Sequence, residues 1–146
     1  MTSTPLLAQS NKALPSSPQL LVLGDSLSAE YGLPRGSGWV QLLSNQLRKD
    51  GSPWQIVNAS ISGETTAGGL SRLPDLLKRA KPRLVIIELG ANDALRGLSL
   101  SATQKNLKEM IVLSKKSGAE VLLLGMQIPP NYGQEYTKQF ARLFVS

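Results

Sequence analysis

The sequence predicts a three-layer α/β/α domain around a parallel β-sheet. Short apolar segments with the length of buried strands alternate along the chain with longer segments in which apolar residues recur at helical spacing. Small polar residues, with glycine among them, follow the predicted strands. An alternation of strand and helix requires crossover connections, which produce a parallel sheet covered by helices on both faces. The 146 residues are enough to form one core and too few for two.

The composition is that of a folded protein and excludes several kinds of chemistry. Hydrophobic residues make up 41% and charged residues 18%, and no apolar run approaches the length of a membrane span. Cysteine is absent, which excludes disulfides and cysteine-ligated metal sites. Histidine is also absent, so no residue acts as an imidazole base or ligand. We therefore expect neither a metal nor another cofactor.

The net charge is +6, from 16 basic and 10 acidic residues. The basic residues are spread along the chain, apart from small groups within residues 79–83 and 115–116, and only 5% of residues are aromatic. Nucleic-acid sites typically combine clustered basic residues with aromatic ones, and this pattern is not present. We predict a solvated basic surface and no nucleic-acid partner, and the sequence indicates no particular oligomeric state.

Residues 1–18 are rich in Ser, Thr, Pro, Asn and Gln and are predicted to form a flexible tail in front of a domain that spans residues 19–146. The tail lacks the basic start and the apolar stretch of a secretory signal. A mature form and a cytoplasmic start therefore both remain open.

The first predicted strand is the continuous apolar run over residues 19–24, which suits a strand buried on both faces. Apolar residues at helical spacing then predict a helix over residues 38–49, and a second strand follows at 54–58. The next helix, over residues 66–80, has one leucine-rich face, and Thr65 is its expected N-cap.

The second half of the chain continues the alternation. The predicted elements are a strand over residues 83–89, a helix over 101–117, a strand over 120–125 and, after a proline-rich turn, a last helix over 134–145. Ser101 is the expected N-cap of the first of these helices, and Gly118 is its expected stop signal.

Candidate functional residues follow three of the strands. Ser26 comes directly after the first strand, Gly63 lies in the loop after the second, and Asn92 follows the third. The carboxyl ends of parallel strands meet at one edge of the sheet, where ligands bind in folds of this class. There the Ser26 hydroxyl is a candidate nucleophile. The N–H groups of Ser26 and Gly63 and the Asn92 amide would form an oxyanion hole, each donor contributing about 3–4 kcal/mol in the transition state. Ordinary strand-end turns are the alternative interpretation.

These residues also carry a family resemblance. The segment Gly24-Asp25-Ser26-Leu27-Ser28, the glycine Gly63 in Ser-Gly-Glu-Thr, and the segment Gly90-Ala91-Asn92-Asp93 resemble three motif blocks of the SGNH (GDSL) hydrolases. Together with residues 58–65, 88–97 and 127–133, these segments are most similar to a bacterial branch of the family, whose multifunctional members act as acyl-CoA thioesterases, lysophospholipases and arylesterases. The resemblance implies a flavodoxin-like fold and a small-molecule acyl ester or thioester substrate.

The same resemblance implies a role for each matched residue. Ser26 becomes the nucleophile, and the Ser26 N–H, the Gly63 N–H and the Asn92 side chain become the oxyanion hole. Asp25 and Asp93 become supporting residues that fix the loops around them. Glu64 and Glu88 are interpreted as local hydrogen-bonding or surface groups.

The chain departs from the family pattern at its last motif, an Asp-x-x-His block that supplies the general base. A serine hydroxyl is a weak nucleophile without a base, so we expect this chain to be inactive or weakly active by itself. Residues 139–146 are amphipathic and end without a helix-terminating residue. We therefore expect the sequence to be the N-terminal portion of a longer hydrolase, lacking its last strand and helix.

Other functions remain open. The alternative is a non-catalytic α/β binding module, of hydrolase-like or receiver-like fold. A nucleotide-binding site is less favoured, because the sequence contains no GxxxxGK[ST] loop.

Overall fold

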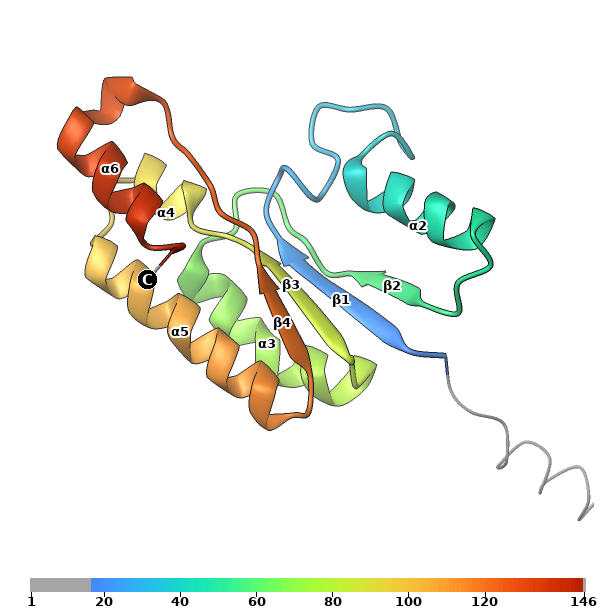
Figure 1. Cartoon of the computed structure of the whole chain (residues 1–146). Coiled ribbons are helices and arrows are strands. Elements are labelled where there is room, and N and C mark those ends of the chain that lie inside the picture. The colour runs from blue at the N-terminus through green and yellow to red at the C-terminus, as the bar shows by residue number, and fades with distance from the viewer. Residues whose placement is uncertain (1–16, 146) are drawn as a thin grey trace, which may run out of the picture.

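The computed structural model describes residues 17–145, and in this part of the chain four parallel strands form one sheet. The strands are β1 (Gln19–Gly24), β2 (Gln55–Asn58), β3 (Leu84–Glu88) and β4 (Glu120–Leu123). The predicted α/β class and the parallel sheet are confirmed (Figure 1). Of the predicted tail, residues 1–16 lie outside the described residues.

The strand order is β2-β1-β3-β4, so the direction of winding reverses between β1 and β3. In open α/β sheets, the carboxyl edge beside such a reversal is the usual place for a ligand. The register places Gly24, the last residue of β1, opposite Glu88, the last residue of β3. The chain segments that follow β1 and β3 therefore start side by side.

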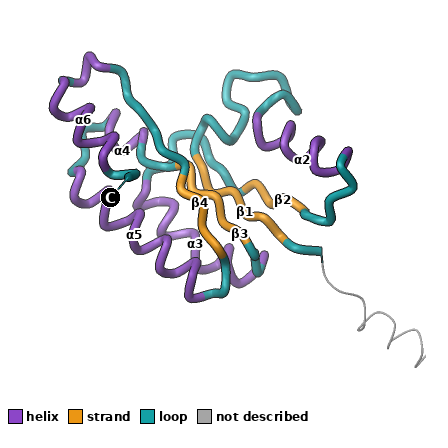
Figure 2. The backbone as a smooth tube through the Cα atoms, viewed as in Figure 1, coloured by secondary structure: helices purple, strands orange, loops and turns teal. Residues whose placement is uncertain are grey.

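Helices cover both faces of the sheet, as predicted (Figure 2). One face packs against α3 (Thr66–Ala80) and α5 (Leu100–Lys116). The core between this face and the two helices includes the buried residues Leu21, Leu23, Val85 and Ile87 from the strands and Leu73 and Met110 from the helices. The other face packs against α2 (Trp39–Lys49), and its buried residues are Leu20, Val22, Ile86 and Val40. Successive residues of β1 alternate between the two cores, which explains why its sequence is apolar without interruption.

A third group of elements lies at the carboxyl end of the sheet. It comprises α4 (Ala91–Leu95), the short 3-10 turn η1 (Pro130–Tyr132) and α6 (Gln134–Arg142), and Figure 1 shows α6 beside α4. A small core of Ala94, Ile128 and Phe140 joins them. Gly90 precedes α4 with a φ of 123°, a value that favours glycine, and a Cβ there would lie 3.3 Å from the Phe144 ring.

The helix ends match the predictions only in part. Thr65 caps α3 as expected, with its hydroxyl accepting from the Gly68 N–H at 3.2 Å. The predicted cap at Ser101 is wrong: α5 begins at Leu100, and Ser99 caps it by accepting from the Ala102 N–H. Both serines lie in one short Ser-Leu-Ser segment, and the upstream one, Ser99, has the non-helical backbone angles that an N-cap requires (φ −59°, ψ 127°). Helix α4 was not predicted at all.

Candidate active site

The three predicted site residues lie in separate segments at the carboxyl edge of the sheet. Ser26 is half-buried in the turn after β1, Gly63 lies in the loop between β2 and α3, and Asn92 is in α4, directly after β3. The Asn92 amide nitrogen donates to the backbone oxygen of Glu64 at 2.9 Å and lies 3.5 Å from the Asp25 carboxylate. One side chain therefore links the loop after β2 to the turn that contains Ser26.

The loop after β2 is held against β1 and α3. The Ile61 N–H donates to the Gly24 oxygen at 3.0 Å, so the chain continues alongside β1 beyond the end of β2. Arg72 of α3 donates to the Ala59 oxygen at 2.6 Å and pairs with Glu64 at 2.7 Å. These contacts fix both ends of the segment that contains Gly63.

Gly63 itself has a φ of 82°, in the left-handed region where a side chain causes strain. The Arg96 guanidinium donates to the Gly63 carbonyl oxygen at 3.0 Å. Within residues 17–145, neither the Gly63 N–H nor the Ser26 N–H donates to a protein acceptor. The second N–H of Asn92 has only the long 3.5 Å contact to Asp25, at the limit of hydrogen bonding. The segments joined by Asn92 thus contain three donors that can serve a ligand.

Asp25 shapes the turn around Ser26. Its side chain is buried, and its Oδ1 atom accepts from the Leu27 N–H at 3.0 Å, forming an Asx turn. The Asp25 backbone oxygen also accepts from the N–H groups of Ser28 and Ala29, at 3.1 and 3.0 Å. Ser26 is thereby placed at the start of a closely hydrogen-bonded turn.

Asp93 anchors α4, the helix that contains Asn92. Its buried carboxylate accepts from the Thr66 N–H at 2.8 Å, from the Thr66 hydroxyl at 2.6 Å and from the Thr103 hydroxyl at 3.1 Å. Thr66 begins α3 and Thr103 lies in the first turn of α5. The side chain beside Asn92 therefore joins three helices, and both of its carboxylate oxygens accept hydrogen bonds.

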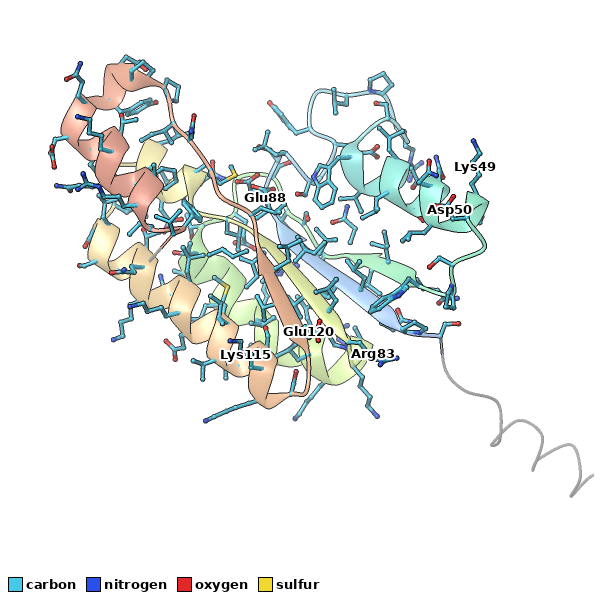
Figure 3. The ribbon with its side chains drawn as sticks, viewed as in Figure 1. Lys49, Asp50, Arg83, Glu88, Lys115 and Glu120 are labelled. Atoms are coloured by element: carbon cyan, nitrogen blue, oxygen red, sulfur yellow. The ribbon has the colours of Figure 1, made fainter. Side chains whose placement is uncertain are left out.

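Glu88 has a buried position and contacts in this region that its interpretation as a local or surface group did not predict. It is a hydrogen-bonding group as interpreted, but it is 3% exposed and not on the surface. Its Oε1 atom accepts from the Ser28 hydroxyl at 2.6 Å and from the Asp25 N–H at 3.2 Å. Burial, with the nearby Asp25 charge as a smaller cause, raises the pKa of Glu88 to about 7. A lone glutamate at the end of an apolar strand was the signal for this burial. Figure 3 shows it at the opposite end of the sheet from Glu120.

Glu64 is the other glutamate interpreted as a local group, and it forms the ion pair with Arg72 described above, with its side chain 12% exposed. Within residues 17–145, no group of three or more Asp or Glu residues is arranged to hold a metal ion.

Two hollows differ in their position relative to these loops. One, of about 410 Å³, lies beside α4 and is lined by Ala94, Leu95, Arg96, Gly97, Tyr132 and Tyr136. A larger one, of about 550 Å³, lies at the start of β2 and is lined in part by Arg48, Trp54 and Gln55. The first adjoins the helix that contains Asn92, whereas the second lies at the amino end of the sheet.

The chain matches the model of the GDSL-like Lipase/Acylhydrolase family over residues 22–145. It is 54% identical over 125 residues to the esterase TesA of Pseudomonas aeruginosa, covering 86% of this chain and 62% of that protein. It is 48% identical over 129 residues to an arylesterase of Vibrio mimicus, covering 88% and 64%. A thioesterase 1/protease 1/lysophospholipase L1 of Escherichia coli is 43% identical over 125 residues, covering 86% and 59%. The chain thus spans less than two thirds of the length of these relatives.

Several solved structures have the same fold as this chain. The crystal structure of TesA has a TM-score of 0.85 at 53% identity, covering 87% of this chain and 71% of that one. The esterase EstA from Pseudoalteromonas, inhibited by monoethylphosphonate, has a TM-score of 0.84 at 46% identity, covering 87% and 69%. AlinE4, an SGNH-hydrolase family esterase, has a TM-score of 0.83 at 38% identity, covering 91% and 71%.

Proposed function

The chain belongs to the GDSL-like lipase/acylhydrolase family, and we propose that it supplies the nucleophile and the oxyanion site of a serine hydrolase that cleaves acyl esters or thioesters. The observation that carries this proposal is the position of Asn92. Its amide lies between the loop that contains Gly63 and the turn that contains Ser26. The relatives named esterase, arylesterase and thioesterase support the same reaction class.

In the proposed reaction, the Ser26 hydroxyl oxygen bonds to the acyl carbonyl carbon, and the carbonyl oxygen becomes an oxyanion. The N–H groups of Ser26 and Gly63 and the Asn92 amide donate to that oxyanion. Each such donor is typically worth about 3–4 kcal/mol in the transition state. The C–O or C–S bond to the leaving group then breaks, and water attacks the acyl-Ser26 ester to release the acid and restore the hydroxyl.

The proton of Ser26 needs an acceptor, and the 146 residues include no histidine. The Asp-x-x-His block that supplies the base in the resembled family has no counterpart among them. Residual catalysis by binding and an oxyanion hole is about 10³–10⁴-fold over water when a triad member is missing. We therefore propose that these residues bind and activate the acyl group, and that hydrolysis at full rate requires an added base.

The hollow beside α4 supports a substrate with an apolar acyl or aryl part. It adjoins the helix that contains Asn92, and Leu95, Tyr132 and Tyr136 line it. No helix in the described residues 17–145 has the length and apolar character needed to cross a bilayer. On the basis of the lining of the hollow beside α4, we propose a small-molecule acyl ester or thioester as the substrate.

A fluorophosphonate probe tests the assignment of Ser26. Its phosphorus forms a bond with the serine oxygen and releases fluoride, and the hydroxyl proton passes to a base, here added imidazole. We expect one adduct, located on Ser26 by peptide mass spectrometry and absent from Ser26→Ala. Ser71→Ala, which removes an exposed serine of α3, is the matched control and should label like the parent. An adduct that persists in Ser26→Ala, or no adduct on Ser26 with imidazole present, contradicts the proposal.

A further inference from the structure

The turn that contains Ser26 is fastened on both sides to one carboxyl group of β3. Before Ser26, the Asp25 N–H donates to Glu88 Oε1 at 3.2 Å. After it, the Ser28 hydroxyl donates to the same oxygen at 2.6 Å. Glu88 thus connects the two flanks of the proposed nucleophile to the strand that leads into α4.

Two further elements meet at the same point. The Trp39 indole N–H, from α2, donates to the Ser28 hydroxyl oxygen at 3.1 Å. The Asn58 amide, from the end of β2, donates to the Ser28 backbone oxygen at 2.9 Å. Ser28 is therefore held by groups from β2, α2 and β3, and a change at Glu88 removes the acceptor on which its hydroxyl depends.

Close packing leaves the Glu88 carboxyl little freedom. A Cβ atom at Gly24 would lie 2.6 Å from the Ser28 hydroxyl oxygen and 2.8 Å from Glu88 Oε1. The carboxyl group approaches the turn only because residue 24 has no side chain. The second oxygen, Glu88 Oε2, is buried without a hydrogen-bond partner in the described part of the chain. An unpartnered buried polar atom costs stability, so fold stability alone does not account for a carboxyl group here.

We propose that Glu88 is a positioning residue for Ser26, whose buried Oε1 atom holds both flanks of the Ser26 turn in register with the segment that contains Asn92. This inference rests on the proposed role of Ser26 as nucleophile. Glu88 acts through Asp25 and Ser28 and does not touch the reacting atoms. Its contribution is geometric, and misplacing a reacting group by about 1 Å can cost on the order of 10²-fold in rate.

The chemistry of the site distinguishes two substitutions. Glu88→Gln keeps an acceptor oxygen at the Oε1 position, and its NH₂ group takes the place of Oε2, which has no partner in this structure. Glu88→Ala removes the acceptor and leaves the Ser28 hydroxyl and the Asp25 N–H without it. The matched control is Glu120→Ala, which truncates an exposed glutamate at the far end of the sheet (Figure 3).

Two measurements on folded protein test the proposal. The first is the rate constant for fluorophosphonate labelling of Ser26 with added imidazole, far below the unfolding temperature of every variant. We expect Glu88→Ala to be at least about tenfold slower than the parent, and Glu88→Gln and Glu120→Ala to stay within about threefold. The second is the ¹H–¹⁵N spectrum, in which Glu88→Ala should shift the Asp25, Ser26 and Leu27 amides and the Trp39 indole N–H, while Glu120→Ala should not.

The two measurements separate the possible failures. If Glu88→Ala labels as fast as the parent, or if Glu88→Gln is as slow as Glu88→Ala, the positioning role is overturned. If Glu88→Ala does not fold, Ser28→Ala replaces it, since that variant removes one of the two bonds to Oε1, and labelling at the parent rate overturns the proposal. If the parent itself is not labelled, the assignment of Ser26 as nucleophile fails. Independently of labelling, unchanged amide shifts in Glu88→Ala would show that Glu88 does not hold the Ser26 turn.

Discussion

Gly24→Ala should destabilise the protein strongly although it adds one methyl group. The new Cβ atom would lie 2.6 Å from the Ser28 hydroxyl oxygen, 2.8 Å from the Ser28 Cβ and 2.8 Å from Glu88 Oε1. Gly24 has no positive φ, so the cost is steric and not conformational. Overpacking of a filled site costs about 1–3 kcal/mol. Displacing the Ser28–Glu88 hydrogen bond adds about 1–2 kcal/mol. The expected loss in the free energy of unfolding is therefore about 2–5 kcal/mol.

Urea unfolding followed by circular dichroism measures this loss, with an unchanged slope taken as evidence that the same transition is observed. Gly125→Ala is the matched control, because its φ is not positive and its new Cβ would lie 3.6 Å from the Phe144 Cβ, an ordinary contact. That variant should lose less than about 1 kcal/mol. Equal stability of the two alanine variants would refute the close packing inferred around Glu88.

Three further predictions follow from the same contacts. The pKa of Glu88 is about 7 in the folded state and 4.5 in the free group, so the unfolded chain loses this proton at lower pH. The free energy of unfolding should therefore fall by about 2–3 kcal/mol as the pH rises from about 4.5 to 7. Urea unfolding at several pH values should show this fall in the parent and in Glu120→Gln but not in Glu88→Gln. Asp93→Asn replaces one acceptor oxygen of a carboxylate that accepts from three donors, and it should lower the free energy of unfolding by about 2–4 kcal/mol. Asp75→Asn, which changes an exposed ion pair, should lower it by less than about 1 kcal/mol. A comparable loss in both variants contradicts the anchoring role of Asp93. With free imidazole present, the parent chain should cleave a 4-nitrophenyl ester on the order of tenfold faster, or more, than Ser26→Ala under the same conditions. Equal rates for the two proteins would show that Ser26 does not use an external base.

Composition and periodicity were enough to predict the sheet, because each strand signals its own environment. The run of Leu20, Leu21, Val22 and Leu23 is apolar on both faces, and these side chains do alternate between the two cores. The segment after β3 gave no such signal. Residues 91–95 contain Asn and Asp, which favour turns as much as a short helix, so the five-residue helix α4 depends on contacts made by Asp93 with two other helices.

The candidate site was predictable as a set of loops but not as a hydrogen-bond network. Parallel topology alone brings the segments with Ser26, Gly63 and Asn92 to one edge, and the motif resemblance names the residues. The contact between Glu88 and Ser28 joins residues 60 positions apart and depends on the register that pairs Gly24 with Glu88. No local pattern encodes that register, so the contact between Glu88 and Ser28 could not be predicted, although the position of Glu88 at the end of an apolar strand indicated its burial.

Strand β3 explains how two distant parts of the proposed chemistry keep a common geometry. Its last residue, Glu88, holds the flanks of Ser26, and Asn92 follows four positions later, after the left-handed Gly90 turns the chain into α4. The same strand pairs with β1 along five residue positions, from Leu20 with Leu84 to Gly24 with Glu88. A movement of β3 would therefore carry the support of the nucleophile and the oxyanion donor together. The distance between them depends on the short segment from Glu88 to Asn92 and on the contacts that anchor α4, in which Asp93 accepts from Thr66 and Thr103.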